Sequence, residues 1–280
     1  MAESVPEWAG EVVDALAYPV VFATVSGAHL YGFASADSDL DLRGAHLLPA
    51  REVVGLRTGP ETCQGGGVRD GVELDVVTHD LAKFCRLLVR PNGYVLEQLL
   101  SPLVVRTSPA HAALVALAPG LVTRHHAHHY LGFAAGQWRL FESSGELKPA
   151  LYTLRVLLTG IHLMRTGEVR TDLRVLAGAG GPGARLGYVA DLIAAKRGAE
   201  HGRYADHRGL PDPERLGADV AALRGELAAA REASALPERA GAVDRVHELL
   251  VTVRLGELAT VVTSGEGVVT VGRAAGRVQR

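Results

Sequence analysis

The sequence predicts an α+β protein, in which a mixed sheet with flanking helices is followed by a bundle of helices. Two observations indicate this class. Up to about residue 107, short apolar and β-branched runs lie between turn residues, as is typical of strands. Beyond that point, apolar residues recur at intervals of three and four, which is the period of a helix. With 280 residues, of which 48% are hydrophobic, the chain can form one large domain or two small ones.

The first third is expected to combine helices and strands. Turn signals bound the strands: Ser26-Gly27 ends the first, and Asp70-Gly71 joins the last two as a hairpin. The expected elements are a helix over Glu7–Leu16, strands over Tyr18–Val25, Asp39–Leu48, Thr62–Arg69 and Val72–Thr78, and a helix over Asp80–Val89 with its cap near Thr78 or His79.

The remainder is expected to be helical. The spacing predicts helices over His111–Leu117, Arg124–Glu142, Leu147–Arg165, Tyr188–Lys196, Pro213–Ala235 and Pro237–Val262. From about Ser264 the chain is rich in Gly and Arg, and we expect it to be disordered. We therefore expect an α/β domain over 1–107, a helical domain over 108–262 and a tail over 263–280.

Composition narrows the class of protein. The net charge of -2 does not by itself call for nucleic acid or an anionic membrane. Cys63 and Cys85 do not make a disulfide framework, and no signal peptide is visible, so a cytoplasmic protein is expected. No apolar run is long enough to cross a bilayer, and no membrane partner is expected.

Three acidic residues are the candidates for a metal site. Asp39 and Asp41 are two apart at the start of a predicted strand, so their side chains are expected on one face. Asp75 lies on the hairpin and completes a triad if its strand neighbours the first. Clustered carboxylates repel, and Mg²⁺ relieves that repulsion. Two such ions could clamp a phosphoryl transfer, with a carboxylate accepting the proton of the attacking hydroxyl. A lone D-x-D is more often a solvated turn, so the prediction depends on all these features together.

The turn before these carboxylates is the candidate phosphate-binding segment. Ser26, Gly27 and Ala28 follow a predicted strand, where backbone N–H groups can face a triphosphate. Gly27 allows close approach of the backbone.

Two segments resemble a known family. Gly27-Ala28-His29-Leu30-Tyr31-Gly32 and Ser38-Asp39-Leu40-Asp41-Leu42-Arg43-Gly44 resemble the G-S…D-x-D signature of DNA polymerase β-like nucleotidyltransferases. The Y-G and D-x-R-G features resemble the RNA-ligase-associated (RlaP) branch. The likeness extends over residues 18 to 200 and includes segments 129–134, 148–155 and 165–168.

The resemblance implies a polymerase β-like mixed sheet as a catalytic domain, a helical C-terminal domain, two Mg²⁺ ions and a nucleoside triphosphate, expected to be ATP. It implies that Asp39, Asp41 and Asp75 are the metal ligands. The residues that it implies around the nucleotide are Ser26, Gly27, Ala28, His29, Tyr31, Arg43, Lys148, Tyr152 and Arg155. The family has Ser where this chain has Ala28, and Ser26 or backbone amides could replace that hydroxyl.

Some of these residues also have a second interpretation. Lys148, Tyr152 and Arg155 share a helix face, which could instead be a solvated basic stripe. Arg43 could pair with a carboxylate or contact phosphate.

Other notable features are expected to be structural. His125 and His129 have the spacing of a metal pair, but no further ligand follows, so a structural or surface role is expected. The G-x-G-x-x-G match over 178–183 follows no strand and is expected to be a linker. Lys196 and Glu200 could reach a cleft, but they are expected at a solvated helix end.

Two functions are consistent with the sequence. The first is an Mg²⁺-dependent nucleotidyltransferase that moves a nucleoside monophosphate, expected to be AMP, to an RNA end, a small molecule or a protein hydroxyl. The alternative is a nucleotide-binding regulatory protein that has lost catalysis, which only Ala28 favours. The sequence specifies neither the acceptor nor the oligomeric state.

Overall fold

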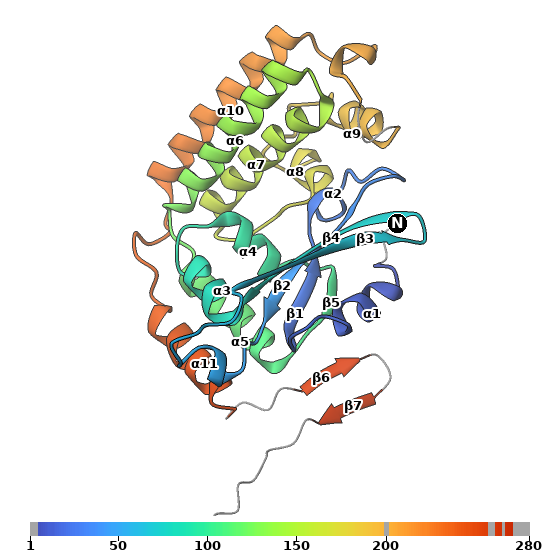
Figure 1. The fold of residues 1–280 in the computed structure, drawn as a ribbon. Coiled ribbons are helices and arrows are strands. Elements are labelled where there is room, and N and C mark those ends of the chain that lie inside the picture. The colour runs from blue at the N-terminus through green and yellow to red at the C-terminus, as the bar shows by residue number, and fades with distance from the viewer. Residues whose placement is uncertain (1–4, 199–201, 257–260, 265–266, 271–280) are drawn as a thin grey trace, which may run out of the picture.

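The computed structural model describes residues 5–198, 202–256, 261–264 and 267–270. Its base is one five-stranded sheet in the order β3-β4-β2-β1-β5 (Figure 1). β2 and β4 run parallel, whereas the other neighbours run antiparallel, so the predicted mixed sheet is confirmed. The strands are β1 (Val20–Val25), β2 (Leu40–His46), β3 (Thr62–Arg69), β4 (Val72–Asp80) and β5 (Val104–Arg106).

Helices flank this sheet and then form a second group beyond one end of it (Figure 1). Near the sheet lie α1 (Trp8–Asp14), α2 (Gly27–Tyr31), α3 (Leu81–Leu88), α4 (Gly93–Leu99), α5 (Pro109–Leu117) and α11 (Val243–Arg254). The second group comprises α6 (His126–Ser144), α7 (Leu147–Thr166), α8 (Leu173–Ala177), α9 (Val189–Arg197) and α10 (Pro213–Ala233). Short 3₁₀ turns occur at Ala50–Glu52, Ala118–Leu121 and Tyr204–Asp206. The predicted α+β class is therefore confirmed.

The edge of the sheet nearest the second helical group is where the candidate residues meet. β1 ends there at Val25, and its antiparallel neighbour β2 begins there, with Val25 opposite Leu42. Because β4 is parallel to β2, the early residues of both strands lie at that same edge. α2 starts directly after β1 and α7 lies beyond it, so turn, strands and helices converge on one region (Figure 1).

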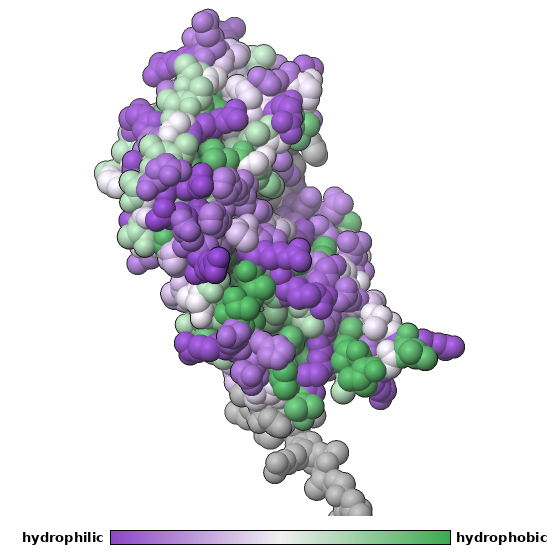
Figure 2. Space-filling view, turned by 90° about the vertical axis from the view of Figure 1, so that its left-hand side faces the viewer, coloured by the Kyte–Doolittle hydropathy of each residue, from purple (hydrophilic) through white to green (hydrophobic). Residues whose placement is uncertain are grey.

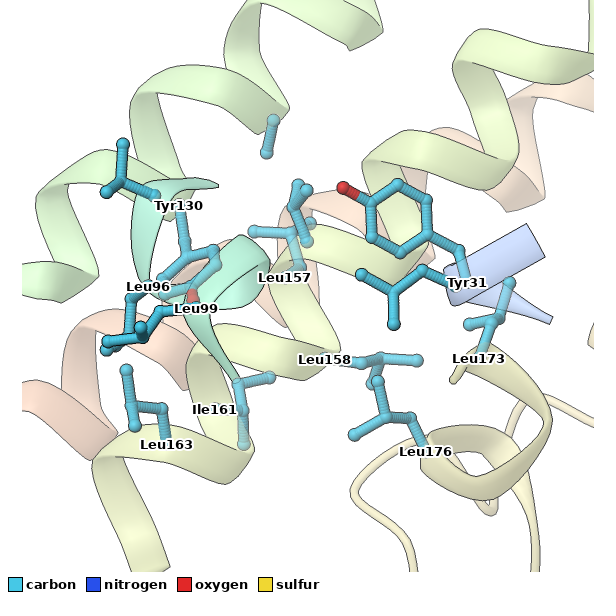
Figure 3. Packing of buried hydrophobic residues seen from close by; sticks show 14 of the residues in the cluster. Tyr31, Leu96, Leu99, Tyr130, Leu157, Leu158, Ile161, Leu163, Leu173 and Leu176 are labelled. Atoms are coloured by element: carbon cyan, nitrogen blue, oxygen red, sulfur yellow. The ribbon is translucent and has the colours of Figure 1, made fainter. Parts of the chain in front are cut away.

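One hydrophobic core joins the sheet-flanking helices to the second group. Figure 3 shows Tyr31 of α2 beside leucines of α7 and α8, and Tyr130 of α6 beside leucines of α4. A smaller cluster on the other face of the sheet includes Val25, Leu42 and Val76. The contact between the two groups is therefore a packed interior that fixes α7 relative to the carboxylate edge.

The helices beyond residue 107 do not all belong to the second group. α5 contacts β1 and α4, and α11 contacts α3 and α5. The Arg254 guanidinium of α11 is 2.9 Å from both carboxylate oxygens of Asp80 at the end of β4. The boundary near residue 107 stays a prediction, but this packing shows that α5 and α11 return to the sheet.

Several expected bounds need correction. The α3 cap is Asp80, whose side chain accepts from the Ala82 amide, and not Thr78 or His79. The helix expected over Pro237–Val262 is shorter, because the amides of Gly241 and Ala242 bond the Gly120 carbonyl instead of continuing a helix. α2, α4, β5 and α8 were not predicted, since three to seven residues are too few to establish a period.

The expected tail falls largely on residues outside the described part. Within it, β6 (Val261–Ser264) and β7 (Gly267–Thr270) pair as an antiparallel hairpin, and the expected disorder of the tail stays a prediction. Residues 265–266 and 271–280 lie outside the described residues.

The surface over α10 and α11 is uneven in polarity. Hydrophilic side chains cover much of the upper part, whereas strongly hydrophobic ones gather in the lower half (Figure 2). Within the described residues, no helix combines the length and the apolar character needed to span a bilayer.

Candidate active site

The Ser26-Gly27 turn is attached directly to the strand that carries Asp41. The Ser26 amide donates to the Asp41 carbonyl at 2.9 Å, which fastens the end of β1 to β2. Gly27 has φ +64, a left-handed conformation that favours glycine. A Cβ added there would lie 1.9 Å from Asp41 Oδ2. Only glycine therefore lets this turn lie against the carboxylate.

Asp41 and Asp75 are neighbours across two parallel strands. The register of β2 and β4 places them opposite one another. Both approach the same atom, because Arg43 Nη2 is 2.6 Å from Asp41 Oδ1 and 2.6 Å from Asp75 Oδ2. The two carboxylates thus converge on a single positive charge. Of the two interpretations of Arg43, the structure shows the one in which it pairs with carboxylates.

Further contacts hold the Arg43 guanidinium in place. It donates to the carbonyls of Asp75 at 2.7 Å and Leu42 at 3.1 Å, and to the Tyr94 hydroxyl at 3.0 Å. Arg43 itself is buried, whereas the Asp75 side chain is 54% exposed. The guanidinium therefore forms the floor of the site, and Asp75 opens toward solvent.

The pKa of the Asp41 carboxyl is shifted by burial and by the charged groups around it. Burial raises the pKa of the Asp41 carboxyl above its ordinary value, and the negative charges of Asp75 and Asp39 raise it further. The positive charges of Arg43 and Lys148 lower it. Lys148, at the start of α7, therefore lies close enough to act on Asp41 from the helical side.

Asp39 does not complete a convergent triad in this conformation. It lies one residue before β2 begins, outside the strand on which it was expected. In the described part of the chain, no three His, Cys, Asp or Glu side chains are arranged to hold a metal ion. In this structure Arg43 occupies the point where Asp41 and Asp75 converge, and the expected metal triad stays a prediction. The roles of the three carboxylates as ligands stay a proposal.

This donor set suits Mg²⁺ bound together with a nucleotide. Mg²⁺ usually takes one or two carboxylates and completes its shell with water and substrate phosphate oxygens. Asp41 and Asp75 supply such a pair, and Asp39 lies nearby in the chain. The chemistry of these residues therefore fits the ion that the sequence predicts.

The serine and alanine of the turn lie in the interior. Ser26 is fully buried, and its hydroxyl has no hydrogen-bond partner among the described residues. Ala28 is buried on the first turn of α2. An unsatisfied buried hydroxyl is uncommon in folded proteins, so Ser26 is a candidate for a group that acquires its partner from a ligand.

Two of the residues expected at the nucleotide, Arg155 and Tyr31, are bound by a buried carboxylate. Arg155 is 2% exposed and donates through Nη1 to both Glu97 oxygens, at 2.7 and 2.8 Å. The Tyr31 hydroxyl donates to the same carboxylate, and the Arg155 Cζ atom lies 3.8 Å from the centre of the Tyr31 ring. The buried Glu97 binds both side chains in this structure, and their expected contact with the nucleotide stays a prediction.

The other two expected contacts, Tyr152 and His29, lie where α2 meets the second helical group. The Tyr152 ring packs edge-on against Tyr31 and Phe33 at 5.6 and 5.4 Å. His29 lines a cavity of about 440 Å³ that also includes Leu100–Leu103 and Val169–Val175 segments. The face shared by Lys148, Tyr152 and Arg155 therefore meets the sheet domain, and it is not a solvated stripe.

A larger cavity lies away from the carboxylates. It has a volume of about 650 Å³ and is lined by Trp138, Phe141 and Tyr204 between α6, α10 and the 3₁₀ turn at Tyr204–Asp206. No member of the carboxylate group borders it. Convergent charge, and not cavity size, therefore identifies the candidate site.

The remaining sequence features are structural within the described residues. His126 is buried, the His125 and His128 rings stack at 6.0 Å, and no metal group forms there. The glycine segment 178–183 follows α8 as a series of turns. Lys196 is fully buried, so the expectation of a solvated helix end was wrong for this residue, and Glu200 lies outside the described residues.

Two important residues were missed by sequence reasoning. Glu97 and Tyr94 each contact an expected site residue. Glu97 had a visible signal, since a lone acid within an apolar run is buried only with a partner. The partners themselves lie dozens of residues away, where no local pattern points to them.

Comparisons with known proteins agree with this geometry. Residues 3–252 match a family described as "RNA repair pathway DNA polymerase beta family". Over 160 residues the chain is 31% identical to the uncharacterized protein MJ0002 of Methanocaldococcus jannaschii. That match covers 54% of this chain and 63% of the relative, so the chain spans less than two thirds of the relative's length.

Proposed function

This chain belongs to the RNA repair pathway DNA polymerase beta family, and from this premise we propose that it is an Mg²⁺-dependent nucleotidyltransferase that transfers AMP from ATP to a hydroxyl or phosphate acceptor. Membership confirms the resemblance seen in the sequence and supports a nucleotidyltransferase-type role. The donor, the metal and the acceptor are the finer parts of the proposal. The observation that carries them is the convergence of Asp41 and Asp75 on one cation beside the Ser26-Gly27 turn.

The proposed reaction is an in-line displacement at the α-phosphorus. The acceptor oxygen forms a bond to that phosphorus, the bond to the bridging oxygen breaks, and pyrophosphate leaves. When bound, Mg²⁺ supplies charge stabilisation for the attacking and leaving oxygens. Asp41 and Asp75, with Asp39, would hold it. Asp75 is the more exposed of the converging pair, and in this proposal it accepts the proton of the acceptor hydroxyl.

Arg43 and Lys148 have different roles in this proposal. Arg43 holds Asp41 and Asp75 side by side and offsets their repulsion. Lys148 acts from the opposite wall, where an ammonium group can bind the triphosphate as a point charge. The Ser26-Gly27 turn offers its backbone and the unpartnered Ser26 hydroxyl to the phosphates.

The acceptor is proposed only by class. The family description favours an RNA end, and a small-molecule or protein hydroxyl would suit the same reaction. The alternative of an inactive nucleotide-binding regulator is favoured by Ala28 alone. Against it stands the presence of all three carboxylates, since a regulator has no need of mutually repelling acids.

Substitution of a central carboxylate tests the proposal. We expect Asp41→Asn to abolish Mg²⁺-dependent release of pyrophosphate from ATP, assayed with pools of RNA, protein and metabolites, while the melting curve stays cooperative. Losing a metal ligand removes transition-state charge stabilisation of several kcal/mol. Asp70→Asn is the matched control, because it makes the same change at the exposed hairpin tip and Asn tolerates the φ of 52 there. Full turnover by Asp41→Asn would refute the proposal.

A further inference from the structure

Lysine is rare in this chain, and its positions are selective. Of the 29 Lys and Arg residues, only Lys83, Lys148 and Lys196 are lysines, which leaves 26 arginines. Lysine offers a compact ammonium on a flexible stem, whereas arginine presents a planar fork, so the two are not interchangeable at a confined site. Lys148 and Lys196 both lie beside the D-x-D segment. Two of the three lysines therefore lie near the candidate site, although arginine is far more frequent in this chain.

Lys196 lies entirely in the interior. It occupies the last turn of α9 and is 0% exposed. Its Nζ donates to Ser35 Oγ at 3.0 Å, across 161 residues of sequence. A buried ammonium group is unfavourable unless polar partners surround it. This contact therefore connects the helical group specifically to the loop that leads into β2.

The loop that receives Lys196 is itself closed by hydrogen bonds. The Ser35 and Ser38 hydroxyls are 2.8 Å apart, and Ser38 Oγ accepts from the Ser35 amide at 3.0 Å. The Ser38 amide donates to the Ser35 carbonyl at 3.2 Å. Both serines are buried, and Asp39 follows at once. The hydrogen bonds between Ser35 and Ser38 therefore set the direction in which the chain continues to Asp39. Lys196 binds this turn through Ser35.

We propose that Lys196 is a positioning residue for Asp39: it fastens α9 to the Ser35–Ser38 turn and so fixes where the first carboxylate of the D-x-D segment enters the site. This inference rests on the proposed function, because it assigns to the Lys196–Ser35 contact, here called the clasp, the role of positioning a metal ligand. The clasp itself joins α9 of the second helical group to the loop before β2. Lys196 touches neither metal nor nucleotide in this assignment.

Metal-nucleotide binding tests the consequence. Lys196→Met keeps the length of the stem and removes the ammonium. We expect it to weaken binding of Mn²⁺-ATP roughly tenfold to a hundredfold, the usual effect of losing a residue that orients a metal ligand. Calorimetric titration measures this without turnover. Ser35→Ala should weaken binding similarly, and the double variant should be no weaker than either single one, because both remove the same contact.

Hydrogen exchange tests the clasp independently of any ligand. In Lys196→Met, the amides of Ser35 and Ser38 should exchange at least several-fold faster. Lys83→Met is the matched control: Lys83 contacts Thr62 on another part of the sheet domain, and its removal should change neither exchange at the turn nor Mn²⁺-ATP binding.

The two readouts separate the two ideas. Unchanged exchange at the turn, additive losses in Lys196→Met and Ser35→Ala, or an equal loss in Lys83→Met would overturn the positioning role. If exchange accelerates as expected but the unsubstituted protein binds no Mn²⁺-ATP or Mg²⁺-ATP, the clasp stands as a structural contact. The proposed function, and with it the role in metal binding, then fails.

Discussion

At the scale of single residues, the candidate site is a balance between two acids and one arginine. Asp41 and Asp75 would repel one another, and the Arg43 guanidinium between them relieves that repulsion. Burial is the main cause of the raised pKa of Asp41, because the charged carboxylate is less stable in the interior than in water. Since a metal ligand must be deprotonated, a divalent cation competes with protons at Asp41. Metal affinity is therefore expected to fall as the pH drops toward that raised pKa.

The hydroxyl of the turn provides a prediction at this scale. Ser26→Ala removes a buried hydroxyl that has no hydrogen-bond partner within the described part of the chain, so we expect the free protein to be as stable or up to about 1 kcal/mol more stable. The same substitution should weaken Mg²⁺-ATP binding roughly tenfold to a hundredfold if that hydroxyl bonds a phosphate. Thermal melting and calorimetric titration measure the two effects. Ala28→Ser is the companion variant, and we expect it to change ATP affinity little. The reverse ranking would assign the phosphate contact to position 28.

At the level of secondary-structure elements, three residues on one face of α7 make different kinds of contact. Lys148 acts on Asp41, Tyr152 packs among aromatic rings, and Arg155 is bound by Glu97. Their spacing places them on one side of the helix, as the sequence predicts. What each side chain does depends on the depth at which it enters the interface, and only Lys148, at the helix start, lies near the carboxylates.

The start of α6 supplies a prediction about pH. His126 is buried, and desolvation lowers its pKa from 6.5 to about 4. Its Nδ1 accepts the Thr123 amide proton at 3.2 Å, which the neutral ring can do. Between pH 6.5 and about 4 the unfolded chain therefore binds one more proton than the folded chain at this residue. Stability is lost as the pH falls through that window, by on the order of 3 kcal/mol in total.

Substitution isolates this contribution from those of the other histidines. We expect His126→Asn to reduce the loss of stability between pH 7 and pH 4, as measured by urea unfolding at each pH. Asn can still accept the Thr123 amide proton but has no charge to gain. His128→Asn, at an exposed position on the same turn, should leave the pH dependence as it is. An equal pH dependence in the unsubstituted protein and His126→Asn would show that His126 is not the group responsible.

At the scale of the whole molecule, buried ion pairs hold the helices to the sheet domain. Arg155 of α7 and Glu97 of α4 are 2.7 Å apart, and each side chain is almost completely enclosed. Arg254 of α11 makes the second such contact with Asp80. These pairs fix orientation, because a charge that is removed from water tolerates little displacement from its partner.

The Arg155 pair gives the prediction at this scale. Arg155→Met should lower the free energy of unfolding by about 3–5 kcal/mol, since it leaves Glu97 buried without its counter-charge. Adding Glu97→Gln should restore much of that loss. Arg165→Met is the control on the same helix: its partner is Glu226 at the surface, and the expected cost is about 1 kcal/mol or less. Denaturant unfolding of the three variants and the unsubstituted protein measures these differences. Similar losses for Arg155→Met and Arg165→Met would contradict a special role for the buried pair.

Sequence patterns alone predict the α+β class, the hairpin formed by Thr62–Arg69 and Val72–Thr78, and the long helices, because those patterns repeat often enough within one element to reveal its period. They also placed the Ser26-Gly27 turn and the D-x-D segment, since their chemistry lies within one short stretch of chain. Short elements such as α2 and β5 escaped, because a few residues do not establish a period.

Only the tertiary structure decided which distant groups meet. It placed Asp75 opposite Asp41 and directed Arg43 to both of them. It also paired Arg155 with Glu97, and it brought Lys196 to Ser35. The physical reason is the same in each case: a buried charge requires a partner, but the partner can come from any part of the chain. Local sequence can therefore show that a partner is needed, and only the packing of the elements decides which residue it is.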